Sequence, residues 1–205
     1  DYFFSPAKLS SITPSEMESF LGRHLQGHHL PNMNERCRLW NELGASLSEN
    51  FEGRATRLLD EANGSAPRLV NLLVQFFPGF RDETLYNNHW VALYKRAQIA
   101  TGDLNAALQL NLQDMDKLTT FADYRVPQVL RHWGVLEYDA VLAEAVDTMQ
   151  ELDPNSQEEV SIRAATVVAV DEIALKLGNG MTAVKLDWHL WQVGEQMNQA
   201  GQLEP

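Results

Sequence analysis

The sequence predicts an all-α protein, and three observations carry that prediction. Apolar residues recur three and four positions apart in most segments between turn signals, which is the period of amphipathic helices. Several of these segments begin at a capping residue and end at glycine or proline. Apolar and polar residues alternate nowhere over a run long enough to predict a sheet. With 205 residues, of which 44% are hydrophobic, we expect one helical domain over residues 1–205.

In chain order, the first predicted helix begins at a capping box, in which Thr13 precedes Pro14 and Glu16. A longer helix is predicted over residues 34–53. Its apolar residues recur at the helical spacing and are Cys37, Trp40, Leu43, Leu47 and Phe51. Two shorter helices are expected to follow, the second of them ended by Pro78–Gly79.

The middle of the chain contains a lysine in an apolar stretch. Residues 80–88 are polar and are predicted as a solvated turn. The helical pattern resumes at Trp90 and puts Lys95 and Gln98 three residues apart on one side. Lys95 is expected either to be partly desolvated in so apolar a helix, or to extend its ammonium group to the surface, as most helical lysines do.

The densest group of reactive side chains lies in residues 118–130. Pro127 suits the first turn of a helix, because its φ is already helical and it has no N–H to leave unpaired. Asp123 and Tyr124 are therefore placed just before a helix N-terminus, where irregular backbone can direct side chains at a ligand. This makes Asp123 a candidate catalytic carboxylate. The alternative is that Asp123 only caps the helix, since Asp is a preferred capping residue.

Two long helices are predicted near the C-terminus. Ser156 and Glu159 form a second capping box that begins a helix ending at Leu177, and Glu159 is spaced to pair with Arg163. This helix is apolar on most sides and is expected to be central to the core. The last helix carries Asp187 among apolar residues, so we expect its carboxylate to be buried, where a charge needs a partner or a ligand.

The composition argues against several classes of protein. A net charge of −12 and a pI near 4.8 argue against a broad grip on nucleic acid, which needs a basic surface. The single cysteine, Cys37, fits a reducing compartment. No apolar run approaches the roughly 18–20 residues of a membrane span, and no basic region precedes the N-terminal apolar residues. We therefore expect a soluble, cytoplasmic protein. His28 and His29 have no further ligand at metal-binding spacing, so neither a metal nor a cofactor is expected.

Four motifs along the chain resemble, in the same order, those of the queuosine salvage protein family. They are YKRAQI at residues 94–99, LTTFADYRVPQ at 118–128, EVSIRA at 159–164 and LDWHLW at 186–191. The resemblance implies an all-α fold like that of the helical DNA glycosylases. It also implies hydrolysis of the N-glycosidic bond of queuosine 5'-phosphate, which releases queuine for reuse in tRNA. The implied partners are these small molecules, without direct contact to nucleic acid or membrane.

The resemblance also implies roles for single residues. It matches Asp123 to the carboxylate that attacks the ribosyl group or stabilises its positive charge, and Lys95 to an active-site lysine. Phe121 and Asp187 match positions that contact the base. The substrate-binding residues expected from the same motifs further include Tyr124, Arg125 and Trp188.

Members of this family are expected to be longer than this chain, with a segment before residue 1 and a short basic, aromatic tail after residue 205. The resemblance therefore implies such an N-terminal segment as a further partner of this chain, and the sequence identifies none of its ligand contacts. Two other functions stay open. One is a non-catalytic helical interaction module, and the other is a base-excision DNA glycosylase, which rests on fold kinship and is weakened by the acidic charge.

Overall fold

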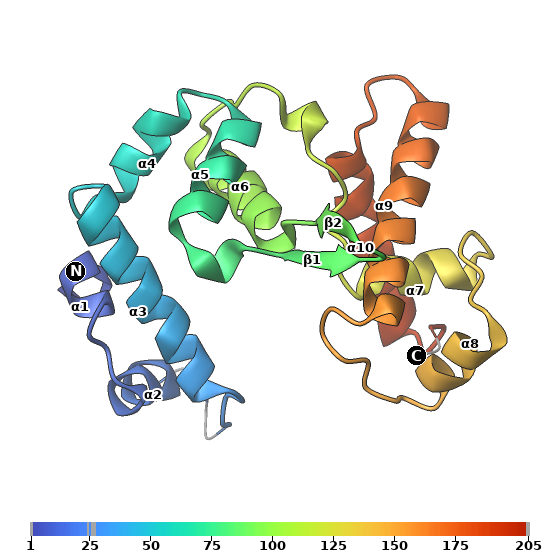
Figure 1. Ribbon diagram of the computed structural model, residues 1–205, viewed down its shortest axis with the longest axis horizontal. Coiled ribbons are helices and arrows are strands. Elements are labelled where there is room, and N and C mark those ends of the chain that lie inside the picture. Colours follow the sequence, from blue (N-terminus) through green and yellow to red (C-terminus); the bar gives the residue numbers. More distant parts are fainter. Residues whose placement is uncertain (1, 24, 26–27, 204–205) are drawn as a thin grey trace. The chain divides into compact units, whose positions relative to one another are not determined.

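The computed structural model describes residues 2–23, 25 and 28–203, and it is predominantly helical (Figure 1). The chain divides into two compact units, Asp1–Arg81 and Asp82–Pro205. The predicted helical fold class is confirmed, because the structure adds only one two-stranded sheet to the helices of the described residues. The expectation that the chain forms one domain stays a prediction.

The first unit is built around one long helix. Its α-helices are α1 (Pro6–Leu9), α2 (Pro14–Gly22), α3 (Met33–Asn50), α4 (Ala55–Ala62) and α5 (Ala66–Phe76), with the 3-10 turns η1 (Tyr2–Phe4) and η2 (Pro78–Phe80). The predicted capping box of α2 is complete, since Thr13 and Glu16 each accept a hydrogen bond from the backbone N–H of the other. Both α1 and α2 pack against α3. Gly44 permits the close approach of α1, because a Cβ there would lie 2.5 Å from the Pro6 carbonyl oxygen.

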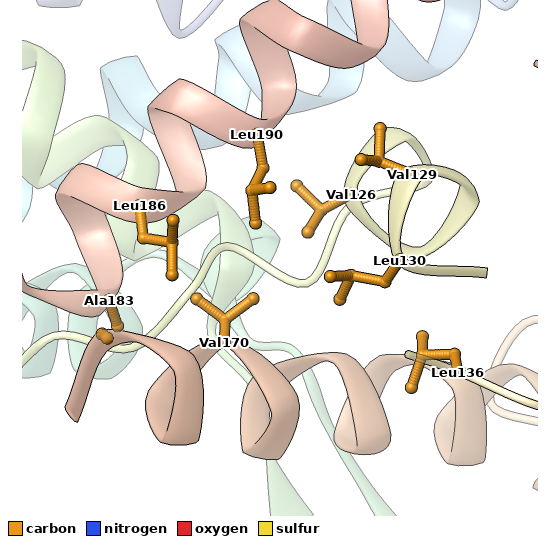
Figure 2. Packing of buried hydrophobic residues seen from close by; sticks show 9 residues of the cluster. Val126, Val129, Leu130, Leu136, Val170, Ala183, Leu186 and Leu190 are labelled. Atoms are coloured by element: carbon orange, nitrogen blue, oxygen red, sulfur yellow. The ribbon is translucent and has the colours of Figure 1, made fainter. Parts of the chain in front are cut away.

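The second unit carries every residue that the sequence marked as a candidate for catalysis or substrate binding. Its elements are β1 (Glu83–Tyr86), β2 (His89–Ala92), α6 (Lys95–Leu108), η3 (Met115–Lys117), α7 (Arg125–His132), α8 (Ala140–Asp147), α9 (Gln157–Leu177) and α10 (Ala183–Gln199). The short helix α7 packs against both α9 and α10. Figure 2 shows Val126, Val170 and Leu190, one from each of these helices, directed toward one another in the apolar core. This packing fixes the N-terminus of α7, and therefore the segment that precedes it, beside α10.

One part of the sequence prediction was wrong between residues 80 and 94. The predicted solvated turn and the helix from Trp90 are replaced by an antiparallel hairpin, in which Leu85 pairs with Trp90. Asn87 and Asn88 form its turn with φ of 46° and 64°, and asparagine tolerates this left-handed conformation better than most residues. Each strand has only four residues, too few to give a clear alternating pattern. Helix α6 therefore begins at Lys95.

The prediction that the long helix α9 is central to the core is confirmed for one face and wrong for the opposite one. Thr166, Val170 and Ala174 are buried, whereas Val168 and Leu175 are 58% and 83% exposed. At 3.6 residues per turn, positions 168 and 175 lie on the side opposite the buried stripe, where a single packed layer cannot cover them.

The second predicted capping box is only half formed. Ser156 accepts a hydrogen bond from the Glu159 N–H at 3.2 Å, but the N–H of Ser156 donates to the Asp153 carbonyl instead. The Glu159 carboxylate is thereby left to pair with Arg163, as the four-residue spacing predicted. Among the described helices, none combines the length and the apolar character that crossing a membrane requires.

Candidate active site

The carboxylate of Asp187 ties α10 to the segment that precedes α7. Asp187 is 3% exposed, which confirms the predicted burial. Its Oδ1 accepts a hydrogen bond from the Thr120 hydroxyl and one from the Phe121 N–H, the latter at 2.8 Å. Within the described residues, its Oδ2 accepts no hydrogen bond and no cation forms an ion pair with it. A buried carboxylate with one oxygen unused is suited to accept hydrogen bonds from a ligand.

Burial raises the pKa of the Asp187 carboxyl above its ordinary value of 3.8. The hydrogen bonds from Thr120 and Phe121 lower this pKa, and the negative charge of Asp123 raises it. The positive charge of Lys95 lowers it, and the net direction is upward. Asp123 and Lys95 each lie within electrostatic range of Asp187, so both candidate catalytic residues lie near one candidate base-contacting residue.

A buried glutamine on α6 holds the start of the same segment. Gln98 is 6% exposed. Its Nε2 donates to the Thr119 hydroxyl and to the Leu93 carbonyl, both at 2.9 Å, and its Oε1 accepts from the Thr119 N–H at 2.9 Å. The two bonds to Thr119 hold residue 119 against α6, and the third ties Gln98 to the end of the hairpin.

Asp123 caps α7, as the structural alternative predicted. Its Oδ1 accepts hydrogen bonds from the N–H groups of Arg125 and Val126, at 3.0 and 3.1 Å. Asp123 is half-buried, and its Oδ2 takes no hydrogen bond from the described part of the chain. Capping therefore uses one oxygen and leaves the other for a ligand, so the two roles considered for Asp123 are compatible.

Lys95 is the first residue of α6, and its position depends on Asp82. The Lys95 N–H donates to Asp82 Oδ2 at 3.0 Å, and the Asp82 carbonyl accepts from the Leu93 N–H at 2.9 Å. Tyr94, between them, has a left-handed φ of 48°. The Lys95 side chain is half-buried, and no hydrogen bond or ion pair within the described residues occupies its ammonium group. The Lys95 ammonium group is therefore only partly desolvated, and no other protein group that the structure describes holds it away from the site.

Arg163 of α9 joins three parts of the second unit. Its Nε donates to the Ala122 carbonyl at 3.2 Å, its Nη1 donates to Glu159 Oε1 at 2.9 Å, and its Nη2 donates to Asp82 Oδ2. Burial lowers the pKa of Arg163, but the hydrogen bond and charge of Asp82 and the charge of Glu159 outweigh it, and the pKa is raised. The cation is thus firmly held next to residue 122.

The aromatic residues differ in how much of their surface a ligand could reach. The Phe121 and Trp188 rings meet edge to face, with centroids 6.3 Å apart. Phe121 is 4% exposed and Trp188 is 39% exposed. Gly102 of α6 lies against this pair, because a Cβ there would be 3.3 Å from Trp188 Cζ2 and 3.6 Å from Phe121 Cζ. Trp188 therefore offers the more accessible ring for stacking on a flat base.

Arg125 is buried and Tyr124 is exposed, although the two side chains are in contact. The Arg125 guanidinium is buried, and it donates to Glu195 Oε1 at 2.7 Å and to Gln128 Oε1 at 2.8 Å. It also lies over the exposed Tyr124 ring, 5.1 Å from the centroid. These contacts join α7 to α10, so the observed partners of Arg125 are protein groups. Its contact with substrate, like that of Tyr124, stays a prediction.

Sequence reasoning missed Asp82, which was included in a solvated turn. Its partners Lys95 and Arg163 lie 13 and 81 residues away, so no local pattern marks it. In the ranges that the structure describes, no three His, Cys, Asp or Glu side chains are grouped so as to hold a metal ion.

Comparison with known proteins agrees with the motifs. The model of the family described as queuosine salvage protein matches residues 2–205. The chain is 39% identical over 175 residues to a Sphaerobacter thermophilus protein named queuosine 5'-phosphate N-glycosylase/hydrolase, and the match covers 82% of this chain and 54% of that protein. A Dictyostelium discoideum protein of the same name is 38% identical over 201 residues, which cover 95% of this chain and 61% of the relative.

A mouse protein of that name is 34% identical over 176 residues, and the match covers 79% of this chain and 52% of the relative. The chain therefore spans little more than half the length of the curated relatives it matches. Because the family model extends over nearly every residue, the chain belongs to the queuosine salvage protein family.

Proposed function

We propose that the protein containing this chain hydrolyses the N-glycosidic bond of queuosine 5'-phosphate and releases queuine. The observation that carries the proposal is the grouping of Asp123, Asp187 and Lys95, with one oxygen of each carboxylate unused within the described residues. The shared name of the relatives supports the choice of substrate. The cytoplasmic location expected from the sequence is part of the same proposal.

In this mechanism, Asp123 acts at the sugar. Cleavage of a ribosyl–base bond builds positive charge on the ribose, and a carboxylate at the anomeric carbon stabilises that charge or attacks the carbon. The free Oδ2 of Asp123 is the atom assigned to this role, because Oδ1 is held by two backbone N–H groups. These bonds also prevent the carboxylate from rotating, so little reorganisation is needed when the charge develops.

Asp187 acts at the base. Queuine presents adjacent N–H donors on its amidine edge, and a single carboxylate can accept from both. Burial without a bound cation makes the charged form of Asp187 costly, and a ligand that supplies N–H donors offsets that cost. The exposed ring of Trp188, with Phe121 behind it, supplies a surface on which the base can stack.

Lys95 has two possible roles that the same site accommodates. Its positive charge can keep Asp123 ionised, or its ammonium group can bind the 5'-phosphate of the substrate. The two roles predict different kinetics for Lys95→Met. Loss of a phosphate contact raises KM, whereas loss of a charge that acts on Asp123 lowers kcat.

The test is release of free queuine from queuosine 5'-phosphate, followed by chromatography, with the full-length protein and with this 205-residue chain. Damaged duplex DNA serves as competitor. We expect release by the full-length protein that the DNA does not inhibit. A full-length protein that binds queuosine 5'-phosphate but leaves it intact would refute the proposed reaction, and inhibition by the DNA would favour a base-excision enzyme.

A further inference from the structure

Within the described part of the chain, the guanidinium of Arg163 is the one group that donates hydrogen bonds next to both proposed catalytic residues. It binds the backbone before Asp123 and the carboxylate that accepts from the Lys95 N–H. The side chain is 14% exposed. Its three nitrogens donate to acceptors on three different stretches of the second unit. These acceptors are the Ala122 carbonyl, Glu159 Oε1 and Asp82 Oδ2.

The first contact fixes the backbone at Asp123. Ala122, directly before Asp123, has a φ of +35°, in the left-handed region that residues with a side chain seldom adopt. Such a conformation persists only where neighbouring groups impose it, and the 3.2 Å hydrogen bond from Arg163 Nε to its carbonyl is one such constraint. Without it, residue 122 can relax to an ordinary φ, and the Asp123 carboxylate turns with the backbone.

The second contact fixes Lys95. The Asp82 Oδ2 atom that accepts from Arg163 Nη2 also accepts from the Lys95 N–H at 3.0 Å. Asp82 therefore connects the guanidinium to the first turn of α6. If Asp82 turns away, the N-terminus of α6 loses its side-chain acceptor, and the Lys95 side chain starts from a less defined position.

We propose that Arg163 is a positioning residue that holds Asp123 and Lys95 in the arrangement needed for cleavage. The proposal rests on the proposed function and deepens it, because it names the group that aligns the reacting side chains. Arginine suits this role because its planar guanidinium donates in three directions at once. Lysine keeps the charge, but its single ammonium group cannot reach three separate acceptors around a guanidinium-sized site.

Arg163→Lys in the full-length protein is therefore the informative variant. It avoids leaving Asp82 and Glu159 without a nearby cation, which would threaten folding. We expect kcat to fall by about tenfold to a hundredfold, the scale of a small misplacement of reacting groups. If Arg163 were instead a direct phosphate ligand, KM would rise and kcat would be unchanged.

The matched control is Arg131→Lys. Arg131 also joins two parts of the second unit, through hydrogen bonds of 2.7 and 3.1 Å to the two oxygens of Asp147. Its guanidinium also lies over the Tyr138 ring, and neither Asp147 nor Tyr138 is a proposed catalytic residue or a hydrogen-bond acceptor of Arg163. We expect turnover to be unchanged in this variant. A fall in kcat confined to Arg163→Lys would then be due to its position beside the site, and not to the loss of a multiply bonded arginine in general.

A double-mutant cycle shows whether Arg163 acts through Asp123. In the Asp123→Asn background, Arg163→Lys should lower the residual kcat by a smaller factor than it does in the wild type, because Asp123 has already lost its charge and only the effect through Lys95 remains. Multiplicative effects of the two substitutions would overturn the proposal. So would wild-type kcat in Arg163→Lys alone.

Amide hydrogen exchange provides a readout that does not depend on the reaction. Exchange at the Lys95 N–H should be faster in Arg163→Lys than in wild type, while the amide of Val141, which is capped by Asp139, should be unaffected. If the wild type releases queuine but exchange at the Lys95 N–H is the same in Arg163→Lys as in the wild type, only the positioning role is overturned. Absence of queuine release by the wild type overturns the proposed function, and the positioning role with it.

Discussion

Replacing Asp123 separates its capping role from its proposed catalytic role, because the structure assigns them to different oxygens. Asp123→Asn retains an oxygen that can accept from the N–H groups of Arg125 and Val126, and asparagine caps helices about as well as aspartate. The unfolding free energy should therefore change by less than about 0.5 kcal/mol. The charge at the second position is lost, and kcat should fall by roughly a hundredfold or more, the scale seen when one electrostatic stabiliser is removed.

Asp123→Ala removes both hydrogen bonds as well as the charge. The two N–H groups, bonded at 3.0 and 3.1 Å in the wild type, lose their acceptor, so the variant should lose about 1–2 kcal/mol of stability. Urea unfolding and queuine release would be measured on the same preparations. Substrate affinity should largely survive in the Asn variant, because the charge is most important when the sugar becomes cationic.

Asp139 provides a matched control for these variants. Its Oδ1 caps α8 with two hydrogen bonds of 2.9 Å, to Val141 and Leu142, and it is no part of the candidate site. Asp139→Asn and Asp139→Ala should reproduce the stability changes of the Asp123 variants and leave kcat unchanged. Wild-type turnover in Asp123→Asn would refute the catalytic assignment and leave capping as its sole role.

Three further predictions concern Asp187 and Gly194. Asp187→Asn should weaken queuine binding by roughly tenfold or more in calorimetry, since it replaces an acceptor oxygen with a donor, and unchanged affinity would contradict base recognition. The pKa of Asp187 is raised by burial, so its stabilising contribution is present below the ordinary value of 3.8 and is lost as pH rises through the higher folded-state pKa. Wild-type stability relative to Asp187→Asn should therefore decline across that window in urea unfolding, and a parallel pH dependence would contradict the shift. Gly194→Ala would put a Cβ 2.6 Å from Arg125 Cγ and 2.9 Å from Val129 Cγ2. Although alanine has the better helix propensity, we expect this variant to lose about 1–3 kcal/mol of stability in thermal unfolding. A gain in stability would show that the contact between α10 and α7 has room for a methyl group.

The helices were predictable because their signals are local. The capping box at Thr13 and the three-and-four spacing of apolar residues lie within one or two turns of each other. The burial of Asp187 could be predicted for a similar reason, since a single charge in an apolar helix must be compensated. The identity of its hydrogen-bond donors, Thr120 and Phe121, could not be predicted, because they lie 67 and 66 residues away in the sequence.

The errors arose where short elements or distant partners decide the structure. The hairpin depends on two asparagines in a left-handed turn and on strands of four residues, which leave little periodicity to detect. The second capping box was half wrong because the Ser156 N–H had a competing acceptor in Asp153. Asp82 carries no sequence signal, although its carboxylate contacts both Lys95 and Arg163.

The bonds from Asp187 to residues 120 and 121 also set when the site can form during synthesis. The ribosome makes residues 118–130 long before α10, and a chain that has not yet reached Ala183 contains neither Asp187 nor the Glu195 partner of Arg125. The segment carrying Asp123 then has exposed donors and an uncovered apolar side. A nascent or proteolysed chain lacking α10 would therefore present this segment to chaperones or proteases, and it would gain the candidate site only when the last helix docks.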